Sequence, residues 1–244
     1  MVTAAPVHAG FPGAVGVSRL RVYDWPTVDG MPGGGTPHVH LACGEGYVVT
    51  AGRGAVQTLT TDGYRETPLE AGVVAWFTPG TLHRLVQHGG LEITVVMQNG
   101  GLPEAGDAVI TLPQAQLADP LTYARAARIP SDAPRAAQAD AARARRDLAT
   151  RRFLELRAAT VGGDPEPLAA FQEAAAALVR PHVGAWTARW QRGAHAAATA
   201  TRAQLDALRD GDARHLAGAR VSATGPAARG RFGMCGRLDV YPGI

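Results

Sequence analysis

Short runs of alternating hydrophobic and polar residues, broken by glycine, proline and aspartate, fill the chain from Val15 to about Met97. Alternation with a period of two is typical of β-strands that bury one face. Two segments, Thr61-Asp62-Gly63 and His88-Gly89-Gly90, have the composition of hairpin turns. The strands predicted are 17–24, 36–42, 46–50, 55–60, 64–68, 73–77, 82–87 and 91–98. About eight short strands at close spacing indicate a β-barrel or β-sandwich.

The periodicity changes after a connector at 99–113, and the second half of the chain is rich in alanine and arginine at helical spacing. The helices predicted are 114–128 with a break at Asp119-Pro120, 131–160 with a cap at Ser131-Asp132, 164–190 with a bend at Pro181, and 194–218. The glycine-rich tail is expected to add strands at 220–223 and 237–241. We therefore predict a β domain over residues 1–113 and an α-helical region with short terminal strands over 114–244.

Composition narrows the functional classes. The 244 residues contain no run of 18 apolar residues, so we expect no membrane-spanning helix. The N-terminus lacks the basic and apolar segments of a signal peptide, which predicts a cytoplasmic location. All 24 basic residues are arginine. Without lysine, the chain has no residue for Schiff-base catalysis, pyridoxal phosphate anchoring or a phosphate-loop lysine.

Charge is divided unevenly along the chain. Residues 1–117 carry 5 Arg and 9 acidic residues, a net charge of −4, whereas residues 118–244 carry 19 Arg and 12 acidic residues, a net charge of +7. A basic region can bind nucleic acid. Because the charges here are mixed and no nucleic-acid-binding motif is present, we interpret the second half as a solvated helical surface and do not expect nucleic acid as a partner.

Two histidines, His38 and His40, are the first candidates for chemistry. Side chains alternate across a strand, so these two leave the same face about 7 Å apart at Cα, and one metal ion could reach both. Imidazole suits zinc, iron, manganese, nickel or copper. The pair alone also fits two solvated surface histidines, because so short a motif is weak evidence.

The residues around this pair resemble the cupin family, whose barrel carries two sequence motifs around one metal ion. The first motif appears as Gly33, His38-Val39-His40, then Glu45 and Gly52, with the leading glycine one position closer than usual. The second appears as Gly72, then Pro79-Gly80-Thr81-Leu82-His83 and Gln87. Thr78 and Gln87 replace the usual proline and asparagine, and neither position is a metal ligand in the family.

The resemblance implies a double-stranded β-helix barrel in which four residues bind one metal ion. These ligands would be His38, His40, Glu45 and His83. Three neutral imidazoles and one carboxylate leave a divalent ion with a net charge of +1 and open positions for water or substrate. Such a set accepts iron, manganese, zinc, nickel, copper or cobalt, so the sequence does not select the metal. A barrel without metal, or with a purely structural metal, is the alternative.

Tyr47 is the one further catalytic candidate. It shares strand parity with Glu45, so its phenol could point into the barrel and act on substrate, although a buried core tyrosine fits equally well. Cys43 lies between the predicted ligands in sequence and could neighbour the metal, but its parity, opposite to that of the histidines, favours buried packing. Cys43 and Cys235 match no metal-binding spacing, and we do not expect a disulfide in a cytoplasmic protein. Trp186, in the helical half, is expected to pack against the barrel or a second subunit.

Three functional classes follow from the resemblance. One is a dioxygenase-like oxidoreductase acting on a small polar molecule in the barrel. Another is a metal-dependent isomerase, epimerase or lyase, which needs a protein base. The third is a non-catalytic small-molecule-binding or sensor module. Candidate bases are scarce, which favours the oxidoreductase and thus an enzyme. Cupin barrels often pair through their outer strands, so we expect a homodimer.

Overall fold

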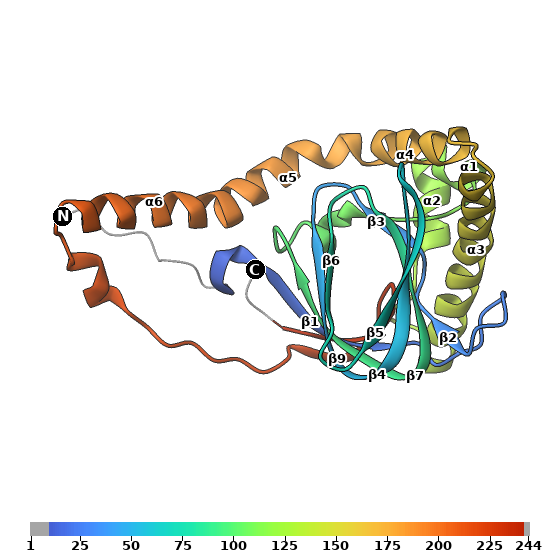
Figure 1. Cartoon of the computed structure of the whole chain (residues 1–244), viewed down its shortest axis with the longest axis horizontal. Helices are drawn as coiled ribbons and strands as arrows, with labels where there is room; N and C mark the ends of the chain where they lie inside the picture. Colours follow the sequence, from blue (N-terminus) through green and yellow to red (C-terminus); the bar gives the residue numbers. More distant parts are fainter. Residues whose placement is uncertain (1–9, 242–244) are drawn as a thin grey trace.

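Two long strands, β4 (Glu45–Thr60) and β7 (Leu82–Met97), frame the N-terminal half of this computed structural model, which describes residues 10–241. They pair antiparallel along their length, from Glu45 opposite Met97 to Leu59 opposite Leu82. The register shifts between Val49 and Gly54, and such irregularities bend a strand and increase its twist. The bent ribbon curls to form part of the barrel wall, and the remaining strands complete the barrel (Figure 1).

The other strands join this ribbon on both sides. β5 (Gly63–Glu70) pairs with the second half of β4, and β6 (Val74–Phe77) pairs with its first half. β1 (Gly16–Val22) pairs with the second half of β7. β2 (Gly33–Gly34) and β3 (His38–His40) pair with the first half of β7, and β8 (Ala108–Ile110) pairs with β3. The predicted mainly-β N-terminal half is confirmed.

One predicted turn is wrong. The segment His88-Gly89-Gly90 does not separate two strands, because β7 runs through it, and the predicted strands 46–50 and 55–60 likewise merge into β4. The glycines instead allow the paired strands to bend. Gly52 has φ of +72°, and a Cβ at Gly54 would lie 2.2 Å from the Val86 carbonyl oxygen. The other predicted turn is confirmed, since Thr60 pairs with Gly63 where β4 meets β5.

The helical half begins directly after β8. Its α-helices are α1 (Gln114–Leu117), α2 (Pro120–Ala127), α3 (Arg135–Val161), α4 (Glu166–Val179), α5 (Val183–Trp190) and α6 (Ala196–Arg209). The predicted break at Asp119-Pro120 is confirmed, and Asp119 caps α2. The start of α3 was placed too early: the residue before a proline is disfavoured in a helix, so α3 begins only after Pro134.

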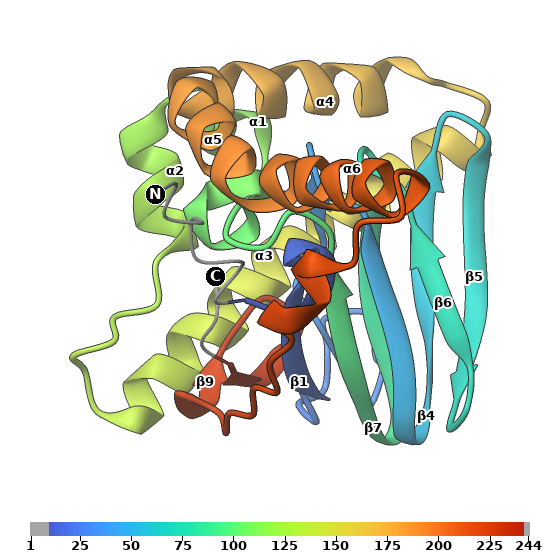
Figure 2. The same cartoon turned by 90° about the vertical axis from the view of Figure 1, so that its left-hand side faces the viewer.

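Shorter helical turns complete the chain. They are the 3-10 turns η1 (Pro12–Ala14), η3 (Arg180–His182) and η5 (Arg214–Gly218), and the π turns η2 (Pro103–Asp107) and η4 (Gln191–His195). The bend predicted at Pro181 therefore appears as the 3-10 turn η3. The run from α4 to α6 passes over the upper end of the barrel and then away from it (Figures 1 and 2).

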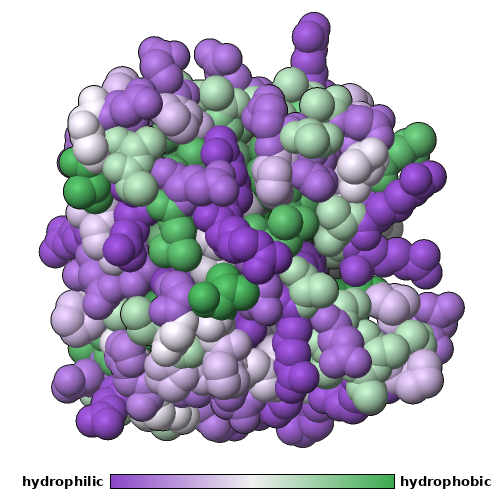
Figure 3. Space-filling view, turned by 90° about the vertical axis from the view of Figure 1, so that its right-hand side faces the viewer, coloured by the Kyte–Doolittle hydropathy of each residue, from purple (hydrophilic) through white to green (hydrophobic). Residues whose placement is uncertain are grey.

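Helix α3 lies along one side of the barrel (Figure 1). It buries Phe153 and Leu156 completely, and the guanidinium of Arg84, from β7, lies 5.3 Å from the Phe153 ring centre. Arg146 donates hydrogen bonds to the Trp25 and Pro26 carbonyls at 2.9 and 2.8 Å. The outward face on this side of the molecule is mainly hydrophilic with scattered apolar side chains (Figure 3). Helix and barrel thus share one core.

The C-terminal tail returns to the sheet. β9 (Ala228–Phe232) and β10 (Gly236–Val240) form a hairpin, and β10 pairs with β1. The strand predicted at 237–241 is confirmed apart from one residue at each end. The strand predicted at 220–223 is wrong: this segment is exposed and pairs with nothing in the part of the chain described. No helix among residues 10–241 is long and apolar enough to cross a membrane.

Replacing Phe153 by alanine tests the packing of α3 on the barrel. The change leaves a cavity in a fully buried position, so the free energy of unfolding should fall by about 3–5 kcal/mol, as measured in urea. Leu121→Ala on α2 is the control, because Leu121 is 69% exposed and its loss should change stability by no more than about 0.5 kcal/mol. A loss at Phe153 as small as the control's would contradict a shared core.

Candidate metal centre

Strands β3, β4 and β7 bring the four predicted ligands together. His38 lies directly opposite His83 in the pairing of β3 with β7. His40 leaves the same face of β3, and Glu45 is the first residue of β4. One ligand atom from each of the four side chains lies within 4.8 Å of every other. Residues from two distant sequence motifs thus meet at one point.

All four side chains are buried; His83 is fully enclosed, and Glu45 is 6% exposed. The Glu45 Oε2 atom lies 3.1 Å from His83 Nε2 and 3.5 Å from His40 Nε2. Among the described residues, neither Glu45 Oε2 nor His83 Nε2 has a hydrogen-bond partner. Buried polar atoms without partners are costly. A cation between these atoms would remove that cost, so the residues fit a metal ion.

The other ring nitrogen of each histidine is already engaged. His38 Nδ1 lies 2.9 Å from the Thr36 carbonyl oxygen, and His83 Nδ1 lies 3.0 Å from that of Thr81. His40 Nδ1 lies 3.0 Å from a carboxylate oxygen of Asp107. Carbonyl and carboxylate oxygens only accept hydrogen bonds, so each neutral ring carries its proton on Nδ1. All three Nε2 lone pairs are then available to a metal ion.

Burial and neighbouring groups favour the metal-binding forms of His38 and Glu45. Burial, together with the rings of His83 and His40, lowers the pKa of His38 well below its usual value. Burial acts to raise the pKa of Glu45, but contacts with His83 and His40 outweigh it and lower that pKa. A neutral imidazole beside an ionised carboxylate is the protonation state that a metal ion needs.

His40 behaves differently from His38. Burial acts to lower its pKa, but the hydrogen bond that His40 Nδ1–H donates to Asp107 and the negative charges of Glu45 and Asp107 outweigh burial and raise it. Asp107 was absent from our sequence-based candidates, because it lies in the connector that was interpreted as a loop. The one signal for it was an acidic residue directly before the short apolar run Ala108–Leu112.

Tyr47 lies beside this group on β4. Its side chain is fully buried, its hydroxyl has no hydrogen-bond partner among the described residues, and its ring contacts Phe77. Burial beside the Glu45 carboxylate raises the pKa of Tyr47 well above its usual value. The phenol therefore stays protonated, which suits it to donate a hydrogen bond or a proton rather than to act as a base.

The two cysteines lie outside the four-ligand group. Both are buried as free thiols, and the burial agrees with the packing favoured for Cys43. Cys43 lies next to Asp107, and Cys235, from the hairpin of β9 and β10, lies against Gly35. Trp186 is buried, packs with the barrel core and donates a hydrogen bond to the Ala105 carbonyl at 3.1 Å. This confirms the packing predicted for Trp186.

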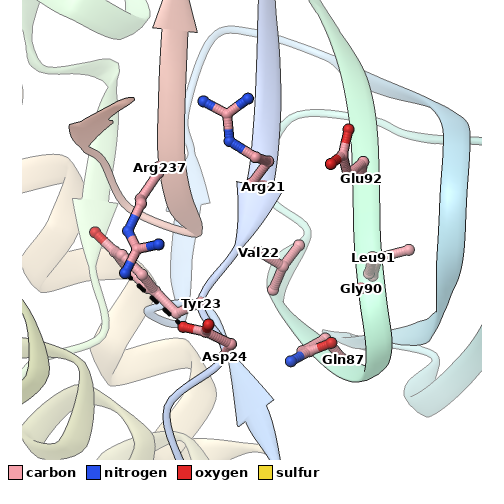
Figure 4. A pocket seen from close by; sticks show the side chains of 9 residues that line it. All are labelled: Arg21, Val22, Tyr23, Asp24, Gln87, Gly90, Leu91, Glu92 and Arg237. Carbon is pink, nitrogen blue, oxygen red and sulfur yellow. Dashed lines mark ion pairs between the residues drawn. The ribbon is translucent and has the colours of Figure 1, made fainter. Parts of the chain in front are cut away.

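A separate cavity of about 300 Å³ lies where β1 and β7 diverge, with Gln87 and Leu91 on one side and Arg21 and Arg237 on the other (Figure 4). Its charges are mostly paired: Arg21 contacts Asp239, and Arg237 reaches a carboxylate oxygen of Asp24 at 4.0 Å. None of the four predicted ligands lines it. The cavity therefore adds no ligand to the metal centre.

Comparison with known proteins adds partial structural matches. No protein-family model matches the chain, and no curated protein sequence does. A conserved protein with a double-stranded β-helix domain from Klebsiella pneumoniae is 17% identical, with 41% of this chain and 83% of that chain covered at a TM-score of 0.30. A predicted oxalate decarboxylase from Thermotoga maritima is 23% identical, with 34% of this chain and 64% of that chain covered at a TM-score of 0.26.

A third match is the TDP-quinovose 3,4-ketoisomerase of Campylobacter jejuni, 12% identical, with 34% of this chain and 60% of that chain covered at a TM-score of 0.29. Identities and TM-scores this low carry no argument about the fold, which is instead assigned from the barrel itself. Its antiparallel strands curl into one barrel, and the residues of both sequence motifs converge inside it. The barrel has the architecture of a double-stranded β-helix. In this barrel, three histidines and one glutamate could bind a metal ion.

Burial of both thiols generates a direct test. Burial raises the pKa values of Cys43 and Cys235, so neither thiolate nor access is available to a thiol reagent in the native protein. We expect no fast reaction with an aromatic disulfide reagent under native conditions and reaction of both thiols after unfolding in guanidinium. Fast labelling of one thiol in the native protein would contradict its burial.

Proposed function

We propose that this chain binds one divalent metal ion through His38, His40, Glu45 and His83, and that the ion acts on a small polar molecule inside the barrel. The observation that supports this most is the convergence of four buried ligand atoms within 4.8 Å. Three neutral imidazoles and one carboxylate would leave the ion with a net charge of +1 and with open positions. Open positions are what a catalytic site needs and a closed structural site lacks.

Within this proposal, metal-centred oxidation of the substrate, as in a dioxygenase, is favoured over isomerisation. A redox-active ion such as iron supplies dioxygen chemistry, whereas zinc supplies Lewis-acid chemistry. Isomerisation, epimerisation and many eliminations also need a protein base. Glu45 would be engaged as a ligand, and Tyr47 is held protonated by its raised pKa. Tyr47 therefore offers a proton donor rather than a base.

The protonated phenol of Tyr47 is also what keeps a metal-dependent isomerase or lyase as the second candidate. A neutral phenol can donate a hydrogen bond to a carbonyl or enolate oxygen of a substrate, and its own oxygen has no partner among the described residues. A Tyr47→Phe variant removes this donor with little change in packing. Under either chemistry it should bind metal as the wild type does and lose turnover.

Removing one ligand tests the metal site. His83→Ala should weaken Zn²⁺ binding by more than the roughly 10–100-fold expected for loss of an outer contact, because a direct ligand is lost. Competition with a chromophoric chelator measures the affinity. His88→Ala is the matched control: it removes a histidine from the same strand, but one whose side chain is exposed. Equal affinities for the wild type and His83→Ala would contradict the proposed site.

The identity of the metal discriminates between the two chemistries. We expect elemental analysis of untagged protein, purified without added metal, to find about one equivalent of iron per chain. Zinc or manganese in its place would favour the Lewis-acid alternative. No stoichiometric metal, together with unchanged metal content in His83→Ala, would contradict the proposal as a whole.

A further inference from the structure

Asp107 is a carboxylate with no role in the two cupin motifs, yet it contacts a predicted metal ligand. It ends the turn η2, directly before β8, and its side chain is fully buried. One carboxylate oxygen lies 3.0 Å from His40 Nδ1. The other accepts hydrogen bonds from the backbone N–H groups of Leu41 and Ala42, at 3.1 and 2.6 Å.

We propose that Asp107 is a positioning residue that fixes the tautomer and ring orientation of His40 and thereby sets the metal affinity of the barrel. The proposal rests on the proposed function, since it concerns the same site. The three histidines differ in the acceptor that their Nδ1 atoms contact. His38 and His83 each bond a backbone carbonyl two residues earlier on their own segment. His40 bonds a side chain 67 positions away.

A carboxylate in this position constrains His40 in two ways. It cannot donate a hydrogen bond, so Nδ1 of the neutral ring must carry the proton and Nε2 must keep its lone pair. Nε2 then faces Glu45 Oε2, 3.5 Å away. An ionised acceptor also makes a stronger hydrogen bond than a carbonyl does, and it raises the basicity of the imidazole as a ligand.

The backbone holds the carboxylate in place. Because Leu41 and Ala42 directly follow His40, their N–H groups tie the second oxygen of Asp107 to the same turn that carries the histidine. β8 adds a second constraint, since His40 pairs with Ala108, the residue after Asp107. Rotation of the carboxylate away from His40 would break both backbone hydrogen bonds.

The helical half also contacts the turn that carries Asp107. Trp186, on α5, is 6% exposed, and its indole Nε1 donates to the Ala105 carbonyl at 3.1 Å. Ala105 lies within η2, two residues before Asp107. The helical half therefore contacts and supports the turn from outside the barrel.

Asparagine at position 107 separates positioning from simple packing. The amide has one acceptor oxygen, so the Leu41 and Ala42 N–H groups would compete for it with His40 Nδ1–H. When the amide oxygen faces them, its NH₂ group faces His40 and requires Nδ1 to accept. The proton of the neutral ring then moves to Nε2, where it blocks metal binding. Asp107→Glu keeps an acceptor-only side chain and is the conservative variant.

Two measurements test the inference on the full chain. Chelator competition should show Zn²⁺ binding weakened about 10–100-fold in Asp107→Asn and less in Asp107→Glu. Nitrogen-15 NMR of the metal-free protein at alkaline pH should show His40 with its proton on Nδ1 in the wild type and on Nε2 in Asp107→Asn. Asp29→Asn is the matched control: Asp29 pairs with the buried Arg84, so its change should lower stability and leave Zn²⁺ affinity unchanged.

The outcomes are distinguishable. A wild type that binds no metal contradicts the proposed function, whereas wild-type affinity in Asp107→Asn contradicts only the role of Asp107. Equal loss of affinity in Asp107→Asn and Asp29→Asn would show a general structural effect and overturn the inference. If Asp107→Asn does not fold, the Zn²⁺ affinity of Asp107→Glu and the wild-type NMR spectrum test the inference. A His40 proton on Nε2 in the wild type overturns it.

Discussion

Buried polar atoms must find partners, and this constraint organises the centre of the barrel. Each of the three histidines donates a hydrogen bond from Nδ1–H to an oxygen acceptor, so three Nε2 atoms face inward together with one carboxylate. Glu45 Oε2 and His83 Nε2 are the buried atoms of this group that lack a partner in the described chain. The acceptors bonded to Nδ1 orient the rings so that the Nε2 lone pairs point inward. A single cation could bind these lone pairs together with the Glu45 carboxylate.

Arginine connects the helical half to this barrel in a chain without lysine. Arg146 donates to the carbonyls of Trp25 and Pro26 in the loop after β1, and Arg145 donates to the Ala127 and Gly233 carbonyls. The planar guanidinium offers several donors in a fixed geometry, which allows one buried side chain to join separate segments. Arg84 does the same from the barrel side, where it bonds Gln57 and Asp29 and lies over Phe153. The helices are thus attached by hydrogen bonds as well as by apolar contacts.

Much of the fold could be predicted from periodicity, and the errors have physical causes. Gly89 and Gly90 were interpreted as a turn, and Gly52 and Gly54 lay in a gap between two predicted strands, although these glycines allow two long strands to bend while the pairing continues. Composition does not distinguish these cases, because a bulge and a turn need the same conformational freedom. The tail strand β9 was misplaced for a similar reason: its pairing depends on β10 and β1, which lie far away in sequence.

The sequence by itself determined the four candidate ligands: strand parity paired His38 with His40, and the resemblance to the two cupin motifs implied Glu45 and His83 as further ligands. Only the tertiary structure showed that their ligand atoms meet, and only it revealed Asp107 behind His40. A hydrogen bond across 67 positions leaves no local pattern, whereas strand parity does. Strand parity and the resemblance of the two motifs therefore indicate which residues could bind a metal ion. Long-range packing decides which way those atoms face and how firmly they are held.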